Sequence, residues 1–221
     1  MTTLLPIRLP ISKPIRDFSL EPGSRMTIPS VTWEEFEEIL QEMGDRRIAR
    51  VAYSQNRLEI TVPRPDHELP TDLIDDMVKT ILRILRIRYQ PFGSTTFKKQ
   101  GIAGIEPDAC FYIQNYERMI GKRQLESHDP PPDLAIETNV TSLTAIEAYR
   151  AIAVPEVWIY ANGGLKIYVL QGGEYVQSET SGIFPQLPIG EWVERAINRA
   201  WTVGSLAALE EVEDRLRNLM S

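Results

Sequence analysis

The order of helical and strand signals along the chain predicts an α/β sandwich, with a central mixed sheet flanked by helices. Apolar side chains recur at the spacing of one helical face over residues 71–87, the longest helical signal. Apolar and polar residues alternate over 58–62, as in a strand with one buried face. Because signals of both kinds follow one another as helix, hairpin, helix, strands, helix and strands, helices and sheet must share a core.

Helix-capping residues, turn sequences and helix-ending glycines predict where the other helices and strands begin and end. Thr32 with Glu35 three residues later is a capping-box signature for a helix through about Met43, and Gly44 ends it. Strands at 47–53 and 58–62 form a hairpin around residues 54–57. Further strands are expected at 94–99, 106–113, 133–137, 157–160, 165–170 and 175–178, and further helices at 142–153, near 190–201 and at 204–219.

A chain of 221 residues is long enough for one domain with a full core. Residues 1–30 hold five prolines and no clear periodicity, so we expect an extended arm that packs on the body or on a partner. The domain itself is expected over 31–221. The arm and the last helix are candidate surfaces for a self-associating scaffold, which predicts a homodimer.

Composition excludes several classes of protein. A single cysteine, Cys110, allows neither a disulfide framework nor a cysteine-based metal site within one chain. The sequence contains no apolar run of about 18–20 residues, and prolines interrupt the segment where a signal peptide would have its apolar core. We therefore expect a cytoplasmic protein with no membrane contact. The net charge of −7 and the pI near 5.0 count against a large nucleic-acid footprint, but they allow a local basic groove.

Two carboxylates stand at the ends of apolar strands. Asp108 follows Pro107 at a strand start, and Glu137 ends a strand whose other face is apolar. A buried carboxylate needs a partner, and Mg²⁺ or Mn²⁺ shared by the two acids would supply one. Glu68, just before the long helix, could reach the same site. Taken singly, such acids are more often solvated or ion-paired, so the residues alone reach a possible metal site and no further.

Several short blocks add a resemblance. Residues 106–108 (EPD), 131–137 (PPDLAIE), Tyr149 and 154–158 (VPEVW), with 93–98 (GSTTFK) and 112–115 (YIQN), occur in this order and spacing. Together they resemble the Uma2 family, which is abundant in cyanobacteria, over about residues 30–185. That family is similar in fold to PD-(D/E)XK restriction endonucleases. The resemblance implies that Asp108 is the aspartate of the PD element, that Glu137 is the acid of the (D/E)XK element, and that both hold Mg²⁺ with the carbonyl of Thr138 as a third ligand.

The chain departs from that pattern at its lysine. A regular (D/E)XK element would place lysine at position 139, where this chain has Asn139, and the alternative position on the following helix is Ala145. Lysine in these enzymes orients the attacking water and offsets charge in the transition state, a role that Asn139 fills only in part. Lys98 is the candidate replacement, because a hairpin centred near Ala103 would place it opposite Asp108.

These observations lead to a first hypothesis, a Mg²⁺-dependent endonuclease that hydrolyses DNA phosphodiester bonds, with Asp108, Glu137, Lys98 and Asn139 as catalytic residues. The ligands of Mg²⁺ (or Mn²⁺) would be Asp108, Glu137, Thr138 and Glu68. The alternative is a catalytically degenerate nuclease fold that acts as a nucleic-acid or protein interaction module. We expect Tyr149 and Trp158 to be core residues and His128 to be solvated.

Overall fold

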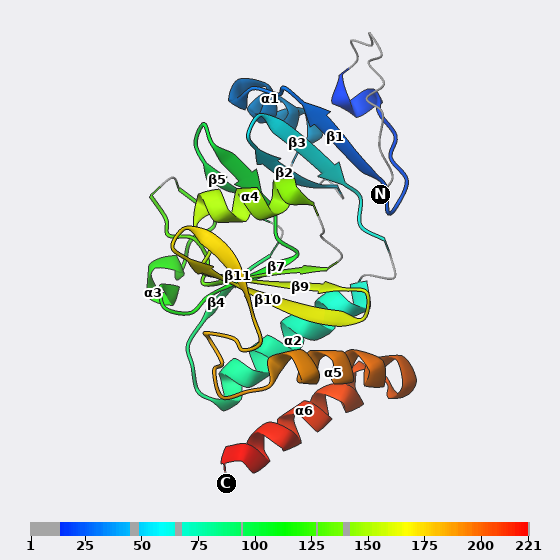
Figure 1. Ribbon diagram of the computed structural model, residues 1–221, viewed down its shortest axis with the longest axis vertical. Coiled ribbons are helices and arrows are strands. Elements are labelled where there is room, and N and C mark those ends of the chain that lie inside the picture. Colours follow the sequence, from blue (N-terminus) through cyan, green and yellow to red (C-terminus); the bar gives the residue numbers. More distant parts are fainter. Residues whose placement is uncertain are drawn as a thin grey trace.

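The computed structural model describes residues 14–44, 49–64, 68–93, 95–126, 128–138 and 142–220. These residues form two β-sheets (Figure 1). The five-stranded sheet has the order β1-β3-β2-β6-β5, with antiparallel neighbours throughout. Its strands are β1 (Arg25–Pro29), β2 (Arg50–Ser54), β3 (Arg57–Thr61), β5 (Phe97–Lys99) and β6 (Ala103–Ile105).

The six-stranded sheet has the order β11-β10-β9-β8-β7-β4. It is mixed, because β8 and β9 run parallel while its other neighbours are antiparallel. The crossover that two parallel strands require is made through helix α4. Its strands are β4 (Gln90–Phe92), β7 (Ala109–Tyr112), β8 (Leu134–Thr138), β9 (Glu156–Ala161), β10 (Gly164–Gln171) and β11 (Glu174–Ser178).

Helices separate and cover the two sheets (Figure 1). Helix α1 (Trp33–Met43) packs on the outer face of the five-stranded sheet, and α4 (Leu143–Ile152) lies between the sheets. Helices α2 (Glu68–Ile84) and α5 (Ile189–Val203) cover the outer face of the six-stranded sheet, and α6 (Ser205–Met220) packs on both. The short elements are η1 (Ile15–Asp17) and α3 (Tyr116–Met119). The predicted α/β sandwich with a central mixed sheet flanked by helices is confirmed.

Side chains alternate between the two faces of β2 and β3, and this alternation decides which residues face the space between the sheets. Val51, Tyr53, Leu58 and Ile60 pack against α1 on one side of the hairpin. Arg50, Ala52, Glu59 and Thr61 therefore project from the other side, toward the six-stranded sheet. The predicted capping box of α1 is present: the Thr32 hydroxyl accepts a hydrogen bond from the Glu35 N–H, and the Glu35 carboxylate accepts one from the Thr32 N–H.

The helices around the site agree with the prediction within a few residues. Helix α4 begins after the N-cap Ser142, and its C-cap Ala153 adopts a left-handed conformation. Helix α2 begins three residues before the predicted start, because Pro70 is tolerated in the first turn of a helix. Within the described residues, no helix combines the length and the apolar character needed to cross a membrane.

The structure corrects the register predicted for Lys98. Lys98 pairs with Gly104 and not with Asp108, because the turn is centred on Gly101, whose φ of 73° favours glycine. The strand expected over 106–113 begins only at Ala109, the first residue of β7, because residues 106–108 cross from β6 in one sheet to β7 in the other. Pro107 lacks the N–H that would continue the ladder of β6.

Two strands were not expected. β1, formed by the last residues of the predicted arm, pairs with β3 at the edge of its sheet. β4 pairs with β7.

Candidate metal centre between the two sheets

Asp108 and Glu137 lie side by side at one end of the six-stranded sheet. β7 and β8 pair Ala109 with Ile136, so the same register places Asp108 opposite Glu137. Asp108 Oδ2 accepts hydrogen bonds from the backbone N–H of Thr138 at 2.9 Å and from its hydroxyl at 2.8 Å. The Thr138 hydroxyl lies 2.8 Å from that of Thr71, in the first turn of α2. Strand β8 and helix α2 thus hold the Asp108 carboxylate in one orientation.

Glu137 is a buried carboxyl with a second carboxyl beside it. Only 3% of its surface is exposed, and it accepts a hydrogen bond from the hydroxyl of Tyr149 in α4. Burial raises the pKa of Glu137 well above its ordinary value, and the charge of Asp108 raises it further. The Tyr149 hydrogen bond, the charge of Arg50 and the backbone N–H of Asp108 act in the opposite direction without cancelling the shift. A nearby cation would relieve this cost.

One cavity of about 280 Å³ brings the two carboxylates together with residues of the opposite sheet. Thr138, Thr71 and Glu68 line it on the side of the six-stranded sheet and α2. The five-stranded sheet and the loop after β3 contribute further lining residues, among them Arg25, Arg50, Ala52, Glu59, Thr61 and Arg64. The structure thus brings Asp108, Glu137, Thr138 and Glu68 to one cavity.

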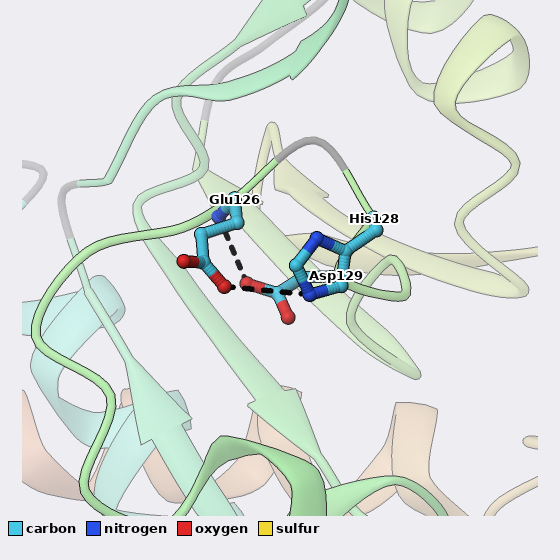
Figure 2. Close-up of side chains that lie close together, drawn as sticks. All are labelled: Glu126, His128 and Asp129. Atoms are coloured by element: carbon cyan, nitrogen blue, oxygen red, sulfur yellow. Dashed lines mark hydrogen bonds and ion pairs between the residues drawn. The ribbon is translucent and has the colours of Figure 1, made fainter.

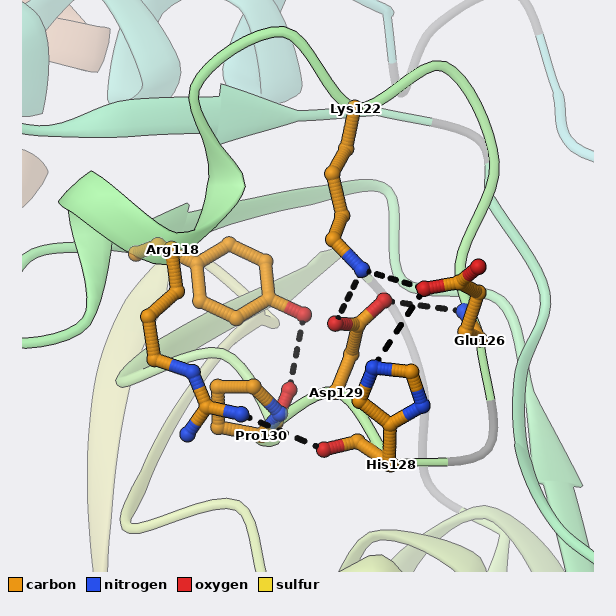
Figure 3. A network of polar contacts seen from close by, with 7 residues as sticks. Arg118, Lys122, Glu126, His128, Asp129 and Pro130 are labelled. Carbon is orange, nitrogen blue, oxygen red and sulfur yellow. Dashed lines mark hydrogen bonds and ion pairs between the residues drawn. The ribbon is translucent and has the colours of Figure 1, made fainter.

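A second group of acids lies on the surface, in the loop that leads into β8. Figure 2 shows Glu126, His128 and Asp129, the one group of three in the described part of the chain whose ligand atoms all lie within 4.8 Å of one another. The ammonium of Lys122 donates hydrogen bonds to both carboxylates, to Glu126 Oε2 at 2.7 Å and to Asp129 Oδ1 at 2.6 Å (Figure 3). A cation of the chain itself therefore compensates these acids.

The same network ties down the surface loop. His128 Nε2 lies 3.4 Å from Glu126 Oε2, and the His128 side chain is largely exposed, in agreement with its predicted solvation. The backbone carbonyls of His128 and Pro130 accept hydrogen bonds from Arg118 and from the Tyr112 hydroxyl (Figure 3). These contacts describe an ion-pair network that orders the loop.

Comparison with known proteins places this fold. The sequence profile of the Uma2 family, described as "Putative restriction endonuclease", matches residues 33–198. This chain belongs to the Uma2 family. The Uma2 chain also resembles a crystal structure described as "a putative nuclease belonging to DUF820" from Anabaena variabilis, with a TM-score of 0.51 and 14% identity over 81% of this chain and 99% of that one. That likeness concerns the fold. No curated protein matches the chain.

The structure of the Uma2 chain does not bring Lys98 to the carboxylates. Its ammonium donates a 2.8 Å hydrogen bond to Glu37 Oε1 of α1, and Lys98 does not line the cavity. Asn139 lies outside the described residues. The alternative lysine position does face the site, because Ala145 lines the cavity, but it presents only a methyl group.

Of the described residues that the sequence did not predict as site residues, Tyr149 and Arg50 lie nearest the two carboxylates. Tyr149 is the buried core residue that was predicted, with 1% exposed, yet its hydroxyl contacts Glu137. Arg50 begins β2 and approaches Asp108, with its Nε 3.8 Å from Asp108 Oδ1. One signal was available for Arg50: it alternates with Val51 and Tyr53, which places it on the face of the hairpin that looks away from α1.

Proposed function

We propose that this Uma2 chain is a Mg²⁺- or Mn²⁺-dependent endonuclease that hydrolyses DNA phosphodiester bonds. The observation that carries the proposal is the convergence of Asp108 and Glu137 in one cavity, where the buried Glu137 carboxyl lacks a compensating charge in hydrogen-bond contact. A divalent cation is the partner that two adjacent carboxylates favour. The description of the family agrees with this reading.

The donor set at the cavity suits a hard cation. Asp108 and Glu137 offer carboxylate oxygens. Glu68, in the first turn of α2, lines the same cavity, but the three carboxylates do not all lie within 4.8 Å of one another, so Glu68 would have to move to join the other two on one ion. Neither His nor Cys is among the described residues that line the cavity, which disfavours a softer metal. The carbonyl of Thr138 completes the proposed ligand set. The Thr138 N–H and hydroxyl already hold one oxygen of Asp108, so the other oxygen is the one directed to an ion.

In the proposed reaction the oxygen of a water forms a bond to phosphorus, and the bond from phosphorus to the leaving oxygen breaks. A bound ion would make this water more acidic and offset charge on the phosphate. Tyr149 holds Glu137, and Thr138 with Thr71 holds Asp108, so neither carboxylate must reorganise during the reaction. Asn139, which follows Thr138 in the sequence, remains part of the proposal as a residue that assists the attack of the water.

Nucleic acid is the proposed partner, although the chain is acidic overall. Arg25, Arg50 and Arg64 line the same cavity and offer guanidinium groups to a phosphate. Five acids among the described residues line it as well, Glu59, Glu68, Glu106, Asp108 and Glu137. The divalent cation must therefore offset their charge before an anion enters. A homodimer also stays part of the proposal. Trp201 and Leu206, near the turn between α5 and α6, are 59% and 72% exposed and give an apolar contact surface, which sedimentation of the full chain would test.

Cleavage and metal binding test the proposal together. Supercoiled plasmid should be nicked in Mg²⁺ or Mn²⁺ and remain intact in EDTA. We expect Asp108→Asn and Glu137→Gln each to lower the nicking rate by at least about 100-fold, because each removes a carboxylate from the reacting centre. Asp129→Asn, which changes a carboxylate of the surface network, is the matched control and should keep the wild-type rate.

The same proteins should differ in a thermal melt. Mn²⁺ at about 100 times its dissociation constant stabilises a folded protein by about 2.7 kcal/mol. Wild type and Asp129→Asn should show this rise in melting temperature, and the two site variants should lose it. Nicking by Asp108→Asn at the wild-type rate would contradict the assignment. If the wild-type protein binds DNA but neither binds Mn²⁺ nor nicks the plasmid, the alternative is favoured, a catalytically degenerate nuclease fold that acts as an interaction module.

A further inference from the structure

Arg50 lies in a row of residues that crosses three strands of the five-stranded sheet. Thr61 of β3 pairs with Arg25 of β1 on one side and with Arg50 of β2 on the other. Directly opposed residues share a face and stand about 5 Å apart at Cβ. All three line the cavity, so the row faces the carboxylates across the space between the sheets.

The guanidinium of Arg50 has hydrogen-bonding capacity that the protein leaves unused. Its Nε is buried without a hydrogen-bond partner, and it is the one buried side-chain nitrogen or oxygen of which this is true in the described part of the chain. The nearest acidic oxygen, Asp108 Oδ1, is 3.8 Å away, beyond hydrogen-bond distance. About 28% of the side chain remains accessible. Because Nε itself is buried, an anion that enters the cavity would meet Arg50 through the accessible atoms of its side chain, which lines the cavity.

Other cations near the site are engaged. Arg25 Nε lies 3.5 Å from the carboxylate of Glu59, and Lys98 is hydrogen-bonded to Glu37. The two positions at which the family pattern expects a lysine carry Asn139 and Ala145. Among the described residues, Arg50 is the cation whose guanidinium lies within 4.0 Å of the Asp108 carboxylate.

We propose that Arg50 binds a backbone phosphate of the nucleic acid in this cavity and that, in the reaction proposed above, this is the scissile phosphate. The inference rests on that proposed function and assigns Arg50 the charge-stabilising role of the missing lysine. A guanidinium is planar and can donate to two phosphate oxygens at once. Arginine side chains are not deprotonated in proteins, so the group stabilises negative charge and takes no proton from the attacking water.

The step balances without a further reactant. The water oxygen bonds to phosphorus, its proton passes to solvent, and the leaving oxygen departs as an alcohol after it gains a proton from solvent. Arg50 keeps its charge from beginning to end. The competing explanation is that Arg50 only compensates the charge of Asp108. That role predicts tighter metal binding after its removal and no change in affinity for nucleic acid.

Variants of Arg50 separate these explanations. The probe is a fluorescein-labelled 12-nucleotide single-stranded DNA in Ca²⁺, followed by anisotropy. Arg50→Gln should weaken binding about tenfold and reduce the slope of log affinity against log salt by about 0.7, as expected for one lost phosphate contact on a single strand. The matched control is Arg57→Gln, at the far end of β3, exposed and outside the cavity lining, which should bind like wild type.

Cleavage and Mn²⁺ titration complete the experiment. Arg50→Gln should lower single-turnover cleavage at least about 100-fold and leave Mn²⁺ affinity unreduced. Arg50→Lys, which keeps the charge and guards against a folding defect in Arg50→Gln, should bind DNA several-fold more weakly than wild type because it loses the bidentate contact. Wild-type DNA affinity in Arg50→Gln, or in Arg50→Lys if the first variant does not fold, overturns the inference.

Failure of the inference and failure of the proposed function remain distinguishable. Cleavage by wild type with unchanged DNA binding by Arg50→Gln removes Arg50 and leaves the nuclease. No cleavage by wild type, with DNA binding that Arg50→Gln loses and Arg57→Gln keeps, removes the nuclease and supports Arg50 as the phosphate-binding residue.

Discussion

Two glutamates on neighbouring strands are equally buried, and their surroundings differ. Glu137 ends β8 and Glu156 begins β9, and each is 3% exposed. The Glu156 carboxylate accepts hydrogen bonds from the Trp158 indole at 2.6 Å, from the Ser181 hydroxyl at 2.6 Å and from the Gly182 N–H at 2.7 Å. Glu137 has the Tyr149 hydroxyl and the backbone N–H of Asp108 as donors, and it has the Asp108 carboxyl beside it.

The difference shows that burial alone does not identify a functional carboxylate. Charge-assisted hydrogen bonds from several donors stabilise a buried anion. Glu156 has them and joins the loop at 181–182 to the sheet. Glu137 instead lies beside a like charge, which raises the free energy of its ionised form. The protein retains that unfavourable pairing at the cavity, where an external cation would make it favourable.

The largest expected effect is on Glu156. Glu156→Gln should lower the free energy of unfolding by about 2–4 kcal/mol, because the charge-assisted bonds are lost and one side of the new amide presents a donor to other donors. Urea denaturation of the metal-free protein would measure it. A loss below about 0.5 kcal/mol would mean that the three bonds to Glu156 do not distinguish it from a surface acid.

A smaller effect of opposite sign is expected for Glu137→Gln. The amide keeps an oxygen for the Tyr149 hydroxyl and removes the like charge beside Asp108, so the metal-free variant should be more stable than wild type at neutral pH. A gain of about 1 kcal/mol corresponds to a rise of about 2–4 °C in melting temperature for a chain of this size. The gain should disappear in Mn²⁺, which only the wild type binds tightly.

The pH dependence of this gain has a definite sign. The folded-state pKa of Glu137 is raised above the ordinary value of 4.5, so the folded protein holds this proton more tightly than the unfolded chain. The contribution of Glu137 to stability is therefore fully present below about pH 4.5 and is lost as pH rises toward the folded-state pKa. Melts of wild type and Glu137→Gln should coincide most closely in acid and separate as pH increases. Parallel curves across the whole range would contradict the raised pKa.

Asp108 and Glu137 could be predicted from the sequence, because each acid stands at an end of a clearly apolar strand. Their convergence followed from the pairing of β7 with β8. Lys98 was not predictable in the same way. Its partner depends on where the turn closes and on where the chain leaves one sheet for the other, and a shift of the hairpin centre by two residues moves a cross-strand partner by four.

Arg50 was missed because its role depends on how the two sheets pack. The alternation in the β2–β3 hairpin correctly indicates one apolar face, but a single sequence does not say whether the polar face meets solvent or another layer. Here Glu59 and Thr61 face the cavity with Arg50. Tyr149 was missed for a similar reason. Its apolar surroundings in the sequence predict a buried ring, but they do not say that its hydroxyl contacts Glu137.

The smallest expected effect concerns Lys122, and it tests whether charge compensation also explains the surface network. Lys122→Met removes the ammonium that lies on Glu126 and Asp129 and leaves two acids and His128 within reach of one another. We expect the variant to gain a second, weak Mn²⁺ site in a calorimetric titration, while wild type shows only the site that Asp108→Asn abolishes. Glu126 and His128 are exposed, but the Asp129 side chain is only 4% exposed, so the variant should also lose some stability when this carboxylate loses its ion pair. If Asp129→Asn abolishes Mn²⁺ binding by wild type and Asp108→Asn does not, the metal centre is the surface network, and the contrast between Glu137 and Glu156 has another cause.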